Sequence, residues 1–266
     1  MVPPRQMRPA PRYDTLCVFV VESTQRMQNL FPDLYETVIK QVITQLRTPV
    51  LVEPASKKVP ATKATPCVKL GVVFFGDYFP YSTRTCSSQY FTSNYREFAK
   101  SLKAHRFRGG GRLRCASTEG LVGALEMLDD FEENDPEAHL LNVQQRHVIL
   151  VTSTPPYAEK CRENVHMRYD NFGLDDVGRR MREMRLSFSL VLQRGQKIDD
   201  VEALMTSANY STKAPLVLPL AMSPNFDVRL TNISLPMAST STPTSTSEAT
   251  PSARPQASIA PAQPPK

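Results

Sequence analysis

Four arginines and three glycines stand together at residues 106–114, in the segment RFRGGGRLR. Guanidinium groups bind phosphate, and glycines let a backbone approach a ligand closely. The segment nevertheless lacks the lysine and hydroxyl residue of a P-loop and the GxGxxG order of a dinucleotide site, so nucleotide binding is disfavoured. Two interpretations stay open: an arginine-glycine element that binds a partner, and a tight turn with solvated arginines. The turn is favoured, and among binding roles a protein partner is favoured over nucleic acid.

Residues with the chemistry for hydrolysis are present, but they do not form a recognised pattern. The four histidines are His105, His139, His147 and His166, and none stands in a nucleophile motif. Cys161 is close in sequence to His166, yet nothing nearby would orient the imidazole. The carboxylates between residues 129 and 135 crowd a helix end, which is typical of a solvated face. We therefore expect a chain that is not an enzyme and that uses no cofactor or small-molecule substrate.

The elements that must position these residues alternate along the chain. Short apolar runs predict buried strands at residues 15–21, 68–75, 148–151 and 187–192, and three- and four-residue periodicity predicts helices at 27–46, 94–104, 117–131, 174–184 and 198–208. Residues 83–91 and 216–220 are candidate edge strands, and 48–66 is an expected loop. The pattern predicts an α/β domain, with a doubly wound, mostly parallel sheet, helices on both faces and one antiparallel edge strand. Such sheets bind ligands at the carboxyl ends of their strands, here after Val21, Ala104 and Val151.

The loop after the first strand resembles that of a von Willebrand A domain. In that family the strand ends in Asp-x-Ser-x-Ser, and a threonine and an aspartate from two further loops complete a magnesium site. The resemblance places five residues of this chain at those positions: Glu22, Thr24, Arg26, Cys115 and Ser153. A thiol, a neutral hydroxyl and an arginine are poor replacements for hard oxygen ligands. The resemblance therefore implies a degenerate metal site with no bound metal, and a magnesium-dependent ligand-binding A domain is the alternative.

Further stretches are similar to the von Willebrand A-like domain of the Mediator subunit 25 family, in a divergent form. They are Val18–Thr24, where that family also has glutamate, Phe107–Gly111 followed by Cys115, Glu119–Leu121, Ala124–Leu125 leading to Leu128–Phe131, and Pro155–Tyr157. The order and spacing of the stretches support the resemblance, whereas Arg112 and Arg114 depart from the family. The resemblance implies a nuclear domain that tethers its protein to the Mediator complex, a coactivator that connects transcription activators to RNA polymerase II.

Composition limits the folded part of the chain. Residues 1–12 form an expected disordered basic arm, residues 13–222 the expected domain, and residues 223–266 an expected disordered tail rich in proline, serine and threonine. The net charge of +6 falls to +2 once the +3 of residues 1–12 and the +1 of residues 236–266 are set aside. That small excess weakens a nucleic-acid interpretation, which remains a second alternative. No apolar run is long enough to predict a membrane span.

The sequence thus predicts a protein-interaction domain that works through its surface. The expected partners are Mediator subunits and transcription activators, with no membrane partner. The expected contact residues lie on the glycine-arginine loop and after the third strand: Arg108, Arg112, Arg114, Pro155, Pro156 and Tyr157.

Overall fold

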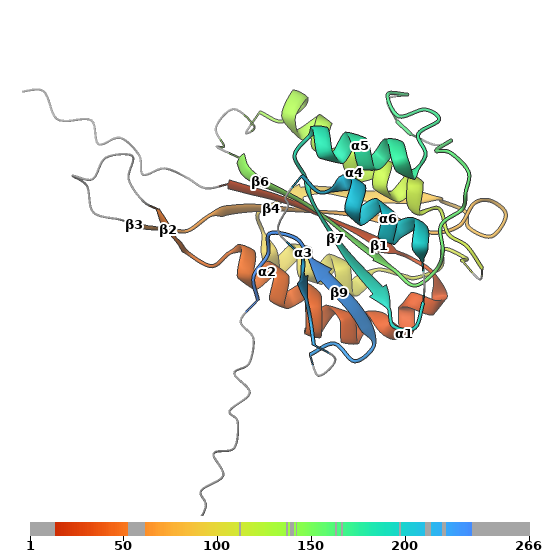
Figure 1. Ribbon diagram of the computed structural model, residues 1–266, viewed down its shortest axis with the longest axis horizontal. Coiled ribbons are helices and arrows are strands. Elements are labelled where there is room, and N and C mark those ends of the chain that lie inside the picture. The colour runs from red at the N-terminus through yellow and green to blue at the C-terminus, as the bar shows by residue number, and fades with distance from the viewer. Residues whose placement is uncertain are drawn as a thin grey trace, which may run out of the picture. The chain divides into compact units, whose positions relative to one another are not determined.

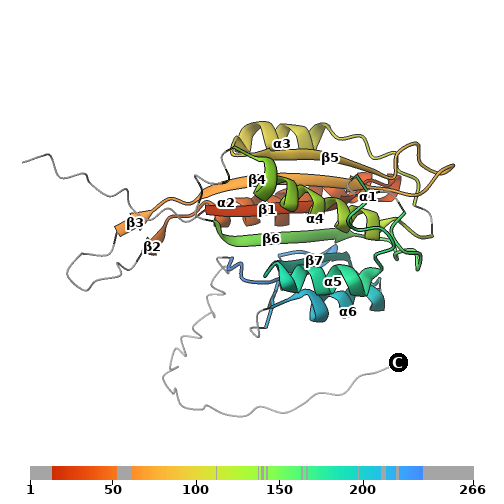
Figure 2. The ribbon, with the colours of Figure 1, turned by 90° about the horizontal axis from the view of Figure 1, so that it is seen from above.

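A seven-stranded sheet forms the centre of the computed structural model, which describes residues 14–52, 62–111, 113–136, 138, 141, 143–162, 164–165, 167–196, 198–210, 214–219 and 222–235. Its strand order is β5-β4-β1-β6-β7-β9-β8. The strands are β1 (Asp14–Glu22), β4 (Cys67–Phe75), β5 (Cys86–Thr92), β6 (Val143–Thr152), β7 (Ser187–Gln193), β8 (Leu216–Val217) and β9 (Phe226–Leu230). Figure 2 shows β5, β4, β1, β6 and β7 side by side.

The four central strands β4, β1, β6 and β7 are parallel, as the sequence predicts. Every residue of β1 is buried. Its side chains alternate between two cores, with Val18 in one and Phe19 in the other. A strand covered on both faces needs apolar residues at every position, which explains the continuous apolar run that predicted it.

Helices cover both faces of the sheet (Figure 1). On one face lie α4 (Ser117–Asn134), α5 (Leu174–Glu183) and α6 (Asp199–Ala208); on the other lie α1 (Gln25–Leu34), a π-helical turn η1 (Tyr35–Ile39), α2 (Lys40–Leu46) and α3 (Tyr95–Ala104). The hydroxyl of Thr24 caps α1, and the side chain of Asn94 caps α3. The predicted α/β fold class with helices on both faces is confirmed.

The two edges of the sheet are antiparallel. β5 pairs antiparallel with β4, as predicted, and β8 lies within the expected edge segment at 216–220. β9 is a strand that we did not expect, and it pairs antiparallel with both β7 and β8. The expected domain end at residue 222 is therefore wrong, since the sheet continues to Leu230. Its sequence FDVRL alternates apolar and polar residues, which is the signal of a half-buried strand.

The predicted loop at 48–66 holds a short antiparallel pair, β2 (Val50–Val52) and β3 (Thr62–Ala64). The expected arm at 1–12 and the tail from residue 236 lie outside the described residues. Within the part of the chain that the structure describes, no helix has the length and apolar character needed to cross a membrane.

His147 of β6 is fully buried in the sheet. Burial lowers its pKa from 6.5 to about 4, because the charged imidazolium loses its hydration. Between these two pH values the unfolded chain binds a proton that the folded chain does not. The fold therefore keeps its full stability above about pH 6.5 and loses stability through His147 as the pH falls toward about 4.

The first prediction concerns this histidine. When the pH is lowered from about 7 to about 5, the unfolding free energy of the wild-type chain should fall. This fall should exceed that of the His147→Leu variant by up to about 2 kcal/mol, because leucine does not titrate. Urea unfolding of both chains at the two pH values measures the difference. Equal losses in the two chains would contradict this role of His147.

Candidate functional site

Four loops meet at the carboxyl edge of the parallel strands. The backbone N–H of Gly109, in the loop after α3, donates to the carbonyl of Ser23 after β1 at 2.8 Å, and Asp77 N–H after β4 donates to the Gly109 carbonyl at 2.7 Å. Cys115 N–H donates to the carbonyl of Pro155, in the loop after β6, at 2.9 Å. The three loops expected to carry function are thus joined, together with the 76–85 loop that sequence reasoning did not include.

Glu22 lies at the centre of this junction and is fully buried. One carboxylate oxygen accepts hydrogen bonds from the hydroxyls of Thr24 at 2.5 Å, Ser153 at 3.0 Å and Thr154 at 2.8 Å. The other accepts from the Thr152 hydroxyl at 2.9 Å and the Ser153 N–H at 2.5 Å. Five protein donors therefore surround the carboxylate, and a buried carboxyl group needs such partners. We call Glu22 and its donor residues Thr24, Thr152, Ser153 and Thr154 the Glu22 cradle.

This arrangement does not fit a magnesium ion. The positions expected from the family, Glu22, Thr24 and Ser153, do come together, but they satisfy one another. The Cys115 thiol donates to the carbonyl of Thr154 at 3.3 Å, and burial, followed by the nearby Glu22, raises its pKa above the usual range. A protonated sulfur is a poor ligand for a hard cation.

Arg26 does not occupy the metal position. Its side chain is exposed on the first turn of α1, whereas Glu22 is fully buried. The resemblance places Arg26 at a metal-ligand position, but the structure leaves its side chain outside the buried group around Glu22. The hydroxyl donors, rather than the guanidinium, take the place that a cation has in an A domain.

The glycine-arginine loop is the tight turn that the sequence favours. Gly110 and Gly111 have φ angles of +69° and +73°, a region in which side chains are strained. A Cβ on Gly111 would lie 2.1 Å from the Thr24 side chain, so this glycine lets the loop close over the Glu22 cradle. The Gly111 N–H also donates to the Asp77 carboxylate at 3.2 Å.

Asp77 is a buried residue of the site that the sequence analysis did not single out. Its carboxylate accepts from the Tyr157 hydroxyl at 2.6 Å, and burial and this bond raise the pKa of Tyr157 to about 12. The neighbouring Tyr78 donates to Glu119 of α4, and the Arg162 guanidinium lies 5.8 Å from the Tyr78 ring centroid. The signal in the sequence was the position of Asp77 two residues after the end of a buried strand.

The expected contact residues divide into two groups. Arg114 donates to the Pro156 carbonyl at 2.8 Å, so it lies with Pro155, Pro156 and Tyr157 in one cluster. Pro156 is buried there, while Pro155 and Tyr157 are half-buried. Arg108 is exposed on the same loop as Arg114, and Arg112 lies outside the described residues.

A serine and a histidine also meet at this edge, which the sequence did not indicate. The Ser23 hydroxyl lies 2.7 Å from Nε2 of His105, and the imidazole stacks on Phe74 with ring centroids 3.5 Å apart. Burial lowers the pKa of His105 to about 4. An imidazole with so low a pKa is a weak general base near neutral pH, so the pair has a structural role in holding the loop.

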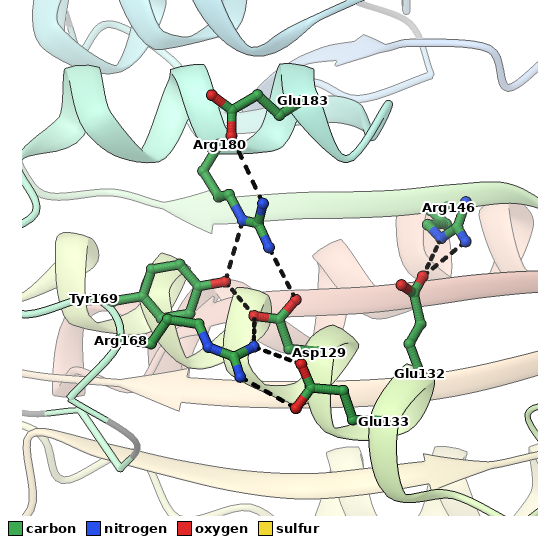
Figure 3. A network of polar contacts seen from close by, with 8 residues as sticks. All are labelled: Asp129, Glu132, Glu133, Arg146, Arg168, Tyr169, Arg180 and Glu183. Atoms are coloured by element: carbon green, nitrogen blue, oxygen red, sulfur yellow. Dashed lines mark hydrogen bonds and ion pairs between the residues drawn. The ribbon is translucent and has the colours of Figure 1, made fainter.

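Asp129 of α4 anchors the long loop between β6 and α5 (Figure 3). Its carboxylate accepts from the Tyr169 hydroxyl at 2.5 Å and from Arg168 at 2.8 Å, both on the loop, and from Arg180 of α5 at 3.3 Å. Asp129 is buried. The expectation of a solvated acidic face is therefore wrong for this residue, whose charge is matched by two arginines.

Comparisons with known proteins agree with this fold. The family model described as Mediator complex subunit 25 von Willebrand factor type A matches residues 13–217. Mediator of RNA polymerase II transcription subunit 25 from Xenopus tropicalis is 30% identical over 106 residues, and that from Xenopus laevis is 29% identical over 106 residues. Each match covers 39% of this chain and 12% of the relative, so this chain aligns with a small part of those proteins.

Two solved structures are similar at low identity. The pilus adhesin SpaC from Lactobacillus rhamnosus GG has a TM-score of 0.44 at 12% identity, covering 75% of this chain and 28% of the adhesin. Proximal thread matrix protein 1 from the mussel byssus has a TM-score of 0.40 at 13% identity, covering 74% of this chain and 41% of that protein.

The Glu22 cradle gives the second prediction. Glu22→Gln should lower the unfolding free energy by about 2–4 kcal/mol, because the amide offers fewer acceptor positions to five inward-pointing donors. Urea unfolding measures the change, and Arg26→Ala, at an exposed position in the first turn of α1, is the control. A variant of unchanged stability, together with a wild-type chain that magnesium stabilises, would indicate a metal site instead.

The third prediction concerns the anchor at Asp129. Asp129→Asn should destabilise the fold by about 1–3 kcal/mol, because Arg168 and Arg180 lose the negatively charged carboxylate that both of them contact. Glu132→Gln is the matched control: Glu132 pairs with Arg146 at 2.7 Å near the surface, and losing such a pair costs about 1 kcal/mol at most. Equal effects of the two substitutions in thermal or urea unfolding would show that Asp129 is not an anchor.

Proposed function

We propose a docking function for this chain, which belongs to the Mediator complex subunit 25 von Willebrand factor type A family. The chain tethers its protein to the Mediator complex in the nucleus and acts as a coactivator domain between transcription activators and RNA polymerase II. It is not an enzyme, and it acts through its surface. Membership of this family supports association with the Mediator complex. The geometry around Glu22 supports recognition through surface side chains, which is the proposed mode of action.

The single observation that carries the mode of action is the closed cradle around Glu22. In an A domain that binds its ligand through a metal, oxygen ligands at this edge must be open to the ion. Here the same carboxylate is fully buried and accepts from five protein donors. Partner recognition at this edge therefore falls to exposed loop side chains such as Arg108 and Arg114.

The test is association with Mediator in cells. A tagged chain of residues 1–266 and a variant that lacks residues 13–235 are purified from nuclei, and the recovered Mediator subunits are quantified by mass spectrometry. We expect the deletion to abolish recovery. The deletion limit follows the last described residue, Leu235, and not the earlier sequence-based boundary.

A chain that lacks residues 236–266 is the control and should retain the Mediator subunits. Recovery that is unchanged by the 13–235 deletion would overturn the proposed function. A chain in which Glu22→Gln abolishes recovery while a stability assay shows no unfolding would overturn the mode of action, because it would assign direct recognition to the buried carboxylate.

A further inference from the structure

Three large apolar side chains are exposed on the two loops whose backbones meet near Glu22. Phe79 is 84% exposed, Tyr81 71% and Leu113 83%. They lie on two loops, 76–85 after β4 and 105–116 after α3. Large apolar side chains exposed to water on neighbouring loops are unfavourable for the free chain, and such surfaces mark interaction sites.

Backbone contacts hold these two loops together. Asp77 N–H donates to the Gly109 carbonyl, and Gly111 N–H donates to the Asp77 carboxylate. A Cβ on Gly110 would lie 2.8 Å from the Tyr81 carbonyl, so the glycine turn and the Tyr81 backbone are in close contact. The apolar side chains therefore stand on a fixed backbone, which reduces the entropy lost when a partner binds.

The same two loops carry one sign of charge at their surface. Arg84, Arg106, Arg108 and Arg114 are exposed. Within the described residues of these two loops the one acidic side chain is Asp77, which is buried. We call the exposed set Phe79, Tyr81, Leu113, Arg84, Arg108 and Arg114 the aromatic–arginine rim.

We infer that the aromatic–arginine rim binds an acidic segment of a partner protein that carries aromatic or large aliphatic side chains. The inference rests on the proposed function, because it assigns a surface and a partner chemistry to the same docking edge. Carboxylates of the segment pair with the arginines, and its apolar side chains cover Phe79 and Leu113. The partner is a peptide rather than a nucleic acid, since a phosphate backbone would leave the aliphatic Leu113 uncovered.

The binding test uses the full chain and three synthetic peptides labelled with a fluorophore. The first combines aspartate and glutamate with phenylalanine and leucine, the second replaces its acids with asparagine and glutamine, and the third replaces its apolar residues with alanine. Fluorescence anisotropy should show binding of the first peptide, weakened by salt, and at least about tenfold weaker binding of the other two.

Two double variants of the rim locate the binding. Arg84→Glu with Arg108→Glu should weaken binding of the first peptide about tenfold or more, and Phe79→Ala with Leu113→Ala should weaken it several-fold. Lys100→Glu on α3 and Val217→Ala on β8, both at exposed positions, are the matched controls and should leave binding unchanged. Thermal unfolding verifies that every variant is folded.

Three results would overturn the inference. They are no binding of the first peptide, equal binding by rim variants and controls, and tighter binding of a single-stranded oligonucleotide that the Arg84→Glu, Arg108→Glu variant abolishes. Mediator recovery separates this inference from the proposed function. If deletion of residues 13–235 abolishes recovery while both rim variants retain it, the docking function stands and the rim is not its surface. If the deletion retains recovery, the docking function itself fails.

Discussion

A buried carboxylate needs hydrogen-bond donors, and the rest of the candidate site depends on how Glu22 meets that requirement. Its donors come from both neighbouring loops, Thr24 after β1 and Thr152, Ser153 and Thr154 at the end of β6. Because Glu22 accepts from both loops, it fixes their separation. These hydroxyl groups satisfy the buried carboxylate and tie the two loops together at the edge of the sheet.

The glycine turn extends this constraint to the surface. The Gly111 backbone lies so close to the Thr24 side chain that a Cβ atom at this position would clash with it. The Gly111 N–H donates to the Asp77 carboxylate. Asp77 in turn holds Tyr157, and Arg114 holds the Pro156 carbonyl. Four loops of different origin therefore share one network, and the exposed side chains above it are presented on an ordered backbone. This is the property that a docking surface needs and that a flexible loop lacks.

Fold alone does not assign function, since open α/β sheets serve many chemistries. For this chain the family match supplies the biological context and the site supplies the physical limit. Ser23 and His105 are within hydrogen-bonding distance, yet the low pKa of the imidazole makes it a weak base. Asp129 is a buried acid, yet Arg168 and Arg180 neutralise it. Each of these groups is held by other residues of the fold: His105 by Ser23 and Phe74, and Asp129 by Tyr169 and the two arginines.

The amino-acid sequence was enough to predict the fold class and the four central strands, because continuous apolar runs and helical periodicity are local signals. The assignment of Cys115 and Ser153 to metal-ligand positions came from the family resemblance and remains a prediction. The exposure of Arg26, the anchoring of a loop by Asp129 and the approach of Tyr81 to the glycine turn became visible only in the tertiary structure. These facts depend on contacts between segments far apart in the chain, which no local pattern encodes. β9 lies between the two cases, because its alternation was visible but its pairing with β7 was not.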